Sequence, residues 1–113
     1  MITPEEWVRQ HFLLYLVHVL KYSPKLIAVE KQLQISERKK RFDIVVYKND
    51  TPFMIVECKE MNVPLSEKTI LQVLHYNSII MAPLMVVTNG GYCAAFRKEG
   101  DQYISLEEIP ACI

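Results

Sequence analysis

Hydrophobic residues recur at helical spacing in two parts of the chain. The segment Thr3-Pro4-Glu5-Glu6 is typical of a helix start, with Thr3 as N-cap and Pro4 in the first turn, and the pattern predicts a helix to about Tyr22. A second helix is predicted over residues 66–81, after Pro64. The expected core residues of the two helices are Trp7, Val8, Leu14, Ile70, Leu71, Leu74, Ile79 and Ile80.

Shorter apolar runs predict strands. The most apolar are Arg41–Tyr47 and Phe53–Lys59, joined by the turn residues 48–52 and apolar at consecutive positions, which is typical of a sheet covered on both faces. Further strands are expected over Leu26–Ile35, Leu84–Thr88, Tyr92–Arg97 and Gln102–Leu106, followed by a loosely packed tail. The resulting order of helix, three strands, helix and strand predicts one α/β or α+β domain over residues 1–113, with a mixed central sheet flanked by helices.

The charge balance argues against a strong nucleic-acid binder. Thirteen basic and thirteen acidic residues give a net charge of zero, so any such binding must be local. The basic cluster is Arg38-Lys39-Lys40-Arg41, which fits either a solvated loop or a nucleic-acid contact beside Asp43. Three cysteines without metal-ligand spacing suggest reduced, mostly buried thiols. No apolar run is long enough to span a bilayer, so we expect a cytoplasmic protein without membrane association.

Three charged residues interrupt the two most apolar strands. Asp43 and Glu57 each lie seven residues from Asp50, so a turn centred there would place them opposite each other, and Lys59 would share the face of Glu57. Two carboxylates about 4 Å apart repel by roughly 4 kcal/mol at an effective dielectric constant of 20. A buried ion pair with the lysine is one way to offset this repulsion. A divalent cation, Mg²⁺ or Mn²⁺ for oxygen ligands, is the other, and it would suit phosphodiester hydrolysis.

Asp43 followed by Glu57-Cys58-Lys59 after an apolar strand resembles the D…ExK motif of the PD-(D/E)XK nuclease superfamily, with Phe42 in place of the usual proline. Further segments extend the likeness over nearly the whole chain, which resembles the N-terminal nuclease domain of type I restriction enzyme R subunits, in particular its small stand-alone members. These segments are Thr3–Arg9, Ile27–Glu30, the basic run into Asp43–Tyr47, Ile55–Lys59, Gln72–Asn77 and Val86–Gly90.

The resemblance implies a restriction-endonuclease-like αβββαβ core and assigns roles to residues. Asp43, Glu57 and the backbone carbonyl of Cys58 match metal ligands, and Lys59 matches the catalytic lysine. Gln72, with Tyr76 four residues later, matches a Gln-x-x-x-Tyr motif beside the active site that helps position DNA; Tyr76 fits a core role equally well. Glu6 is either a helix cap or the acid that the superfamily carries on its first helix. Glu30 is either a solvent-facing strand residue or a third acid.

The function implied is a Mg²⁺- or Mn²⁺-dependent deoxyribonuclease without the motor domains of a restriction enzyme. The expected partners are DNA and either a second copy of the chain or a larger protein assembly, because the neutral chain should bind DNA weakly alone. The alternative from another class is a catalytically silent nuclease-fold module that binds nucleic acid or a protein partner.

Overall fold

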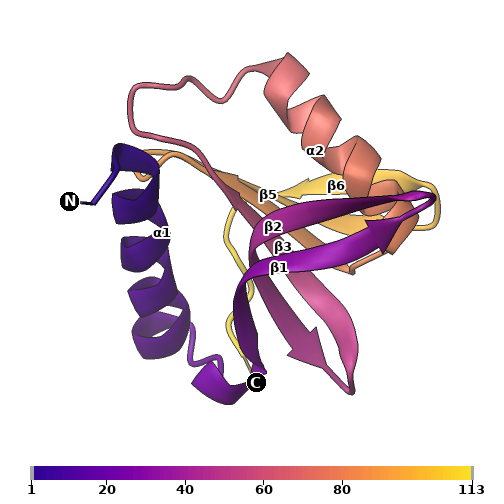
Figure 1. Cartoon of the computed structure of the whole chain (residues 1–113), viewed down its shortest axis with the longest axis horizontal. Coiled ribbons are helices and arrows are strands. Elements are labelled where there is room, and N and C mark those ends of the chain that lie inside the picture. Colours follow the sequence, from indigo (N-terminus) through magenta and orange to yellow (C-terminus); the bar gives the residue numbers. More distant parts are fainter. Residues whose placement is uncertain (1, 113) are drawn as a thin grey trace.

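The computed structural model describes residues 2–112, which form a six-stranded mixed sheet with the strands in chain order (Figure 1). β3 and β4 are parallel, and the other neighbouring strands are antiparallel. This architecture confirms the predicted fold class, a mixed sheet with helices on both faces. The elements are α1 (Pro4–Leu14), η1 (Tyr15–Val19), η2 (Pro24–Leu26), β1 (Ile27–Ile35), β2 (Arg38–Lys48), β3 (Thr51–Cys58), α2 (Glu67–Ile80), β4 (Leu84–Thr88), β5 (Cys93–Glu99) and β6 (Gln102–Leu106).

The first helix begins as predicted and ends differently. The Thr3 hydroxyl accepts a hydrogen bond from the backbone N–H of Glu6 at 3.1 Å, which satisfies one of the free donors of the first turn. Regular α-helix stops at Leu14 and gives way to the π-helical turn η1, instead of continuing to Tyr22. Trp7 and Leu14 were expected in the core, but they are 41% and 56% exposed.

The second helix matches its predicted range closely. Ser66 is the N-cap and accepts from the backbone N–H of Thr69, and Met81 ends the helix in a left-handed conformation with φ 65°. Two of its expected core residues, Leu71 and Ile79, are exposed instead. Their side chains point away from the sheet, and the spacing of apolar residues alone did not show which of them face it.

The two helices cover opposite faces of the sheet, so the central strands are buried on both sides (Figure 1). Val8, Phe12 and Leu16 of the first helical segment pack on one face, against a cluster that includes Ile44 and Val56. Val73 of α2 packs on the other face, against a cluster that includes Val45 and Ile55. Burial on both faces explains why these strands are apolar at consecutive positions.

The β2–β3 hairpin has the register that the sequence predicted, for a different reason. Ile44 pairs with Val56 and Val45 with Ile55, but the turn closes with Lys48 opposite Thr51 rather than around Asp50. The register shifts between Val46 and Tyr47, where a β-bulge adds one residue to β3. The extra residue of the bulge therefore gives Ile44 and Val56 the same alignment that a turn centred on Asp50 would have given them.

Three smaller expectations were wrong. The basic segment Arg38–Arg41 is not a loop but the first part of β2, paired with β1. The C-terminal segment is not loose, because the Tyr22 hydroxyl donates to the Pro110 carbonyl at 2.6 Å and the Cys112 N–H to the Leu20 carbonyl at 2.7 Å. All three cysteines are free, but only Cys58 is buried.

Between residues 2 and 112, none of the helices has the length and apolar character needed to cross a bilayer.

Replacing Met85 by Ala tests the core on the α2 side of the sheet. Met85 lies in β4 with no exposed surface, so Met85→Ala should lower the free energy of unfolding by about 2–5 kcal/mol in urea titrations. Met61→Ala removes the same side chain from a site that is 56% exposed and should change it by less than about 0.5 kcal/mol. Equal losses in the two variants would contradict this packing.

Candidate functional site

The β2–β3 pair brings Asp43 and Glu57 together at one end of the sheet. Extending the register of Ile44 and Val56 by one residue places Asp43 opposite Glu57. The backbone N–H of Cys58 donates to Asp43 Oδ2 at 2.8 Å, and this bond fixes the Asp43 carboxylate beside the Glu57–Cys58 peptide. The N–H of Lys59 donates to the Thr88 carbonyl at 2.8 Å, which ties the end of β3 to β4.

Asp43 occupies an irregular position in its strand. Its neighbours Phe42 and Ile44 pack in the two different cores, so the alternation of side chains breaks at Asp43. On β1, Val29 pairs with Ile44 and Lys31 with Phe42, so Glu30 is the residue that faces Asp43. The backbone of Glu30 is left-handed, with a φ of 51°. A non-glycine residue in this conformation stores backbone strain, which is often found at functional sites.

Glu57 is a buried acid whose charge is only partly compensated. The residue is 6% exposed, and its Oε1 atom has no hydrogen-bond partner among the described residues. Burial raises the pKa of Glu57 to about 7, and the negative charge of Asp43 acts in the same direction. The ammonium groups of Lys40 and Lys59 lower this pKa. The nearer of the two contacts is Lys40 Nζ, 3.7 Å from Glu57 Oε2.

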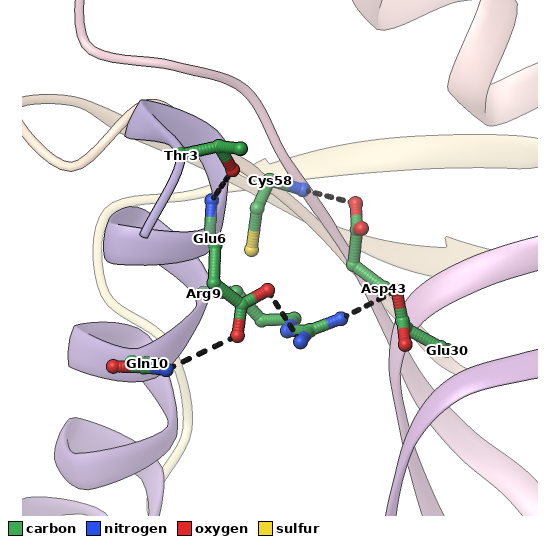
Figure 2. A network of polar contacts seen from close by, with 7 residues as sticks. All are labelled: Thr3, Glu6, Arg9, Gln10, Glu30, Asp43 and Cys58. Atoms are coloured by element: carbon green, nitrogen blue, oxygen red, sulfur yellow. Dashed lines mark hydrogen bonds and ion pairs between the residues drawn. The ribbon is translucent and has the colours of Figure 1, made fainter. Parts of the chain in front are cut away.

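Asp43 also lines a polar cavity of about 250 Å³ between the start of α1 and the sheet. Figure 2 shows Arg9 reaching from α1 between Glu6 and Glu30, beside Asp43. Arg9 forms an ion pair with Glu6 and another with Glu30 at 3.1 Å, and its side chain is only 13% exposed. Glu6 and Glu30 were candidates for the site, and the structure brings them to it as the two anchors of Arg9.

Glu5 is the first-helix acid that the sequence analysis missed. Burial raises the pKa of the Glu5 carboxyl, and the negative charge of Asp43 raises it further. Among the groups that lower the pKa of Glu5, Lys59 has the largest effect. Adjacent acids in a first turn point about 100° apart, and the sequence alone did not show which one faces the sheet.

The Gln-x-x-x-Tyr pair lies on α2, on the same side of the sheet as Glu57. Gln72 is exposed and faces solvent. Tyr76 is half-buried against the α2-side core, and Lys40 Nζ lies 5.3 Å from the centroid of its ring. Tyr76 therefore has a packing role, and its ring also lies near the lysine that reaches Glu57; its predicted role in positioning DNA stays a prediction.

The basic segment divides into two groups. Arg38, Lys39 and Arg41 are exposed, whereas Lys40 is directed to Glu57.

A larger cavity of about 870 Å³ lies between α1 and the C-terminal segment and contains none of the predicted site residues.

The oxygen atoms at the ends of β2 and β3 suit a hard cation, although the protein offers only a few of them as ligands. Within residues 2–112, no three Asp, Glu, His or Cys side chains are grouped closely enough to hold an ion by themselves. An ion would instead use the two carboxylates of Asp43 and Glu57 with main-chain oxygen. The unpartnered Glu57 Oε1 and the mutual repulsion of the acids agree with such a site.

The raised pKa of Glu57 predicts a pH dependence of stability without metal. Between pH 4.5 and about 7 the folded protein binds more protons at Glu57 than the unfolded chain does, so the free energy of unfolding falls as pH rises through this range. Glu57→Gln should be about as stable as wild type at pH 4.5 and more stable by about 2–3 kcal/mol at pH 8, measured by urea unfolding with EDTA. The same difference at both pH values would contradict this.

The comparisons with known proteins identify the family of the chain. No curated protein matches the chain. The family model described as the type I restriction enzyme R protein N terminus matches residues 4–110, which include α1, the complete sheet and every residue of the carboxylate site. The chain therefore belongs to the family of type I restriction enzyme R protein N-terminal domains.

Proposed function

We propose that the chain is a metal-dependent nuclease domain that hydrolyses phosphodiester bonds in DNA. The observation that carries the proposal is Glu57, a buried carboxylate with a free oxygen, beside Asp43 at the end of a strand pair. A structural ion pair would satisfy both oxygens of a buried acid, whereas a ligand waiting for a cation leaves one free. Membership of a restriction enzyme family supports a nuclease over other metal-dependent hydrolases.

The proposed ligands are the carboxylates of Asp43 and Glu57 with the backbone carbonyl of Cys58. The ion, Mg²⁺ or Mn²⁺, would supply Lewis-acid activation of the phosphate and of water. The hydrogen bond from the Cys58 N–H holds Asp43 in a fixed orientation, so little reorganisation is needed on binding. The ion pairs of Arg9 with Glu6 and Glu30 link α1 to β1 around the proposed ligands.

Lys59 is the proposed catalytic lysine. Its positive charge lowers the pKa of both Glu5 and Glu57, which supports a role for Lys59 at the site. There it would orient the attacking water and stabilise the negative charge that develops on the phosphate. Gln72, exposed on α2, would contact the DNA strand next to the scissile bond.

DNA would approach along the first part of β2. Arg38, Lys39 and Arg41 are exposed on the strand that leads directly to Asp43, so phosphates bound there would be guided to the acids. The net charge of zero limits the affinity of one chain. Cutting both strands of a duplex also needs two sites, and a homodimer or a larger protein assembly would supply them.

Substitution at the site tests the proposed chemistry. Asp43→Asn and Lys59→Met should each reduce Mg²⁺- or Mn²⁺-dependent nicking of plasmid DNA by about 10²-fold or more, because each removes a charge at the reacting centre. The matched controls are Asp50→Asn in the β2–β3 turn and Lys68→Met on the exposed side of α2, and both should retain activity. Equal nicking by all five proteins would refute the proposal.

The silent-module alternative predicts a different result in calorimetry. A domain that keeps only the fold would not bind Mn²⁺ at millimolar concentration. The proposed nuclease should bind it, and Asp43→Asn should abolish the heat of binding.

The basic segment gives a prediction on DNA affinity. Replacing Arg38, Lys39 and Arg41 together by Gln should weaken binding to any DNA sequence and reduce the slope of log K against log salt concentration by about 2–3, as expected for three phosphate contacts. Fluorescence anisotropy of a labelled duplex at several salt concentrations measures this. An unchanged slope would exclude this segment from the DNA interface.

A further inference from the structure

Lys40 stands apart from the basic residues around it because its ammonium group is held by several partners. Its Nζ atom lies 3.7 Å from Glu57 Oε2 and donates a hydrogen bond to the Arg41 carbonyl at 3.0 Å. The same atom lies 5.0 Å from the ring centroid of Phe42 and 5.3 Å from that of Tyr76, within the range of cation–π attraction. The side chain is 30% exposed, unlike the solvated Lys39 next to it.

These contacts place a positive charge at one of the two oxygens of Glu57. The other oxygen, Oε1, has no partner among residues 2–112, so Lys40 is the cation nearest to this buried acid. On the other side of the sheet Arg9 is held between Glu6 and Glu30 beside Asp43. Arg9 is thus already engaged by two other carboxylates, whereas Lys40 is the cation that pairs directly with a carboxylate of the site.

We propose that Lys40 is a built-in counter-ion of Glu57 that a divalent cation has to displace when it enters the site. The inference rests on the proposed function, in which Glu57 is a metal ligand. An ammonium group and a divalent ion at one carboxylate repel each other, so the ion gains less from Glu57 while Lys40 stays in place. Lys40 therefore stabilises the metal-free fold and lowers its affinity for metal.

The release of Lys40 would also link the metal site to the surface. Neighbouring side chains of a strand point to opposite faces, so a displaced Lys40 ammonium would stay on the α2 side of β2, near Phe42 and Tyr76, and turn outward to solvent there. Metal binding would thereby convert an internal charge into one available to a phosphate.

Mn²⁺ titration calorimetry on four proteins tests the inference at fixed pH and ionic strength. Lys40→Met keeps a long apolar stem against the Phe42 and Tyr76 rings and removes the charge; it should bind Mn²⁺ about tenfold more tightly than wild type. Lys40→Arg keeps the charge and should bind like wild type. Lys39→Met removes a neighbouring exposed charge and controls for long-range electrostatics, with an expected change of less than about twofold.

The outcomes separate the two proposals. If wild type binds Mn²⁺ and Lys40→Met binds no more tightly than Lys39→Met, the counter-ion role is refuted and the metal site stands. If none of the four proteins binds Mn²⁺, the metal site itself is refuted, and the inference with it.

A metal-free measurement checks the ion pair separately. In EDTA at pH 8, Lys40→Met should lower the midpoint of urea unfolding, and this loss should disappear in a Glu57→Gln background, where no carboxylate charge needs compensation. A loss of the same size in both backgrounds would mean that Lys40 acts through packing alone, and it would overturn the inference.

Discussion

One constraint governs the arrangement of the site: negative charge is buried at the end of two strands that are covered on both faces. Glu57 is nearly as inaccessible as the valines beside it, although an ionised carboxylate loses much of its hydration there. Asp43 adds a second charge, held in place by the main chain of Cys58. Cations lie close to both acids: Lys40 of β2 pairs with Glu57, and Arg9 of α1 lies beside Asp43 while it pairs with Glu6 and Glu30.

The two-sided sheet explains why the site has this form. The α1 face and the α2 face have separate cores, and the acids lie where the two meet at the strand ends. Asp43 is reached from the α1 side, beside Glu5 and Arg9. Glu57 is reached from the α2 side, beside Lys40 and Tyr76. A ligand that bound both carboxylates would therefore join elements that otherwise contact each other only through the sheet.

The elements were largely predictable, because caps, apolar runs and turn residues are local signals. The range of α2 and the limits of β4 and β6 follow directly from Ser66, Pro83 and the turn residues. The alignment of Asp43 with Glu57 was also predicted, although the bulge that produces it was not.

The partners of individual side chains were harder to predict from the sequence. Glu5 and Glu6 carry identical chemistry in adjacent positions, and only the packing angle of α1 decides which one faces Asp43. Nothing in the run Arg38–Arg41 distinguishes Lys40 until β1 pairing fixes the direction of each side chain.

The parallel pairing of β3 with β4 has a consequence for the order of folding. The β2–β3 hairpin is closed by a short turn, whereas β4 reaches β3 only after the segment from residue 59 to residue 83, including α2, has been placed. Contacts between distant parts of a chain form more slowly than local ones, because a longer loop must be closed. We therefore expect Asp43 and Glu57 to come together while water still surrounds them, so that the cost of dehydrating Glu57 arises when α2 and β4 dock. The acids oppose the last step of assembly rather than the first.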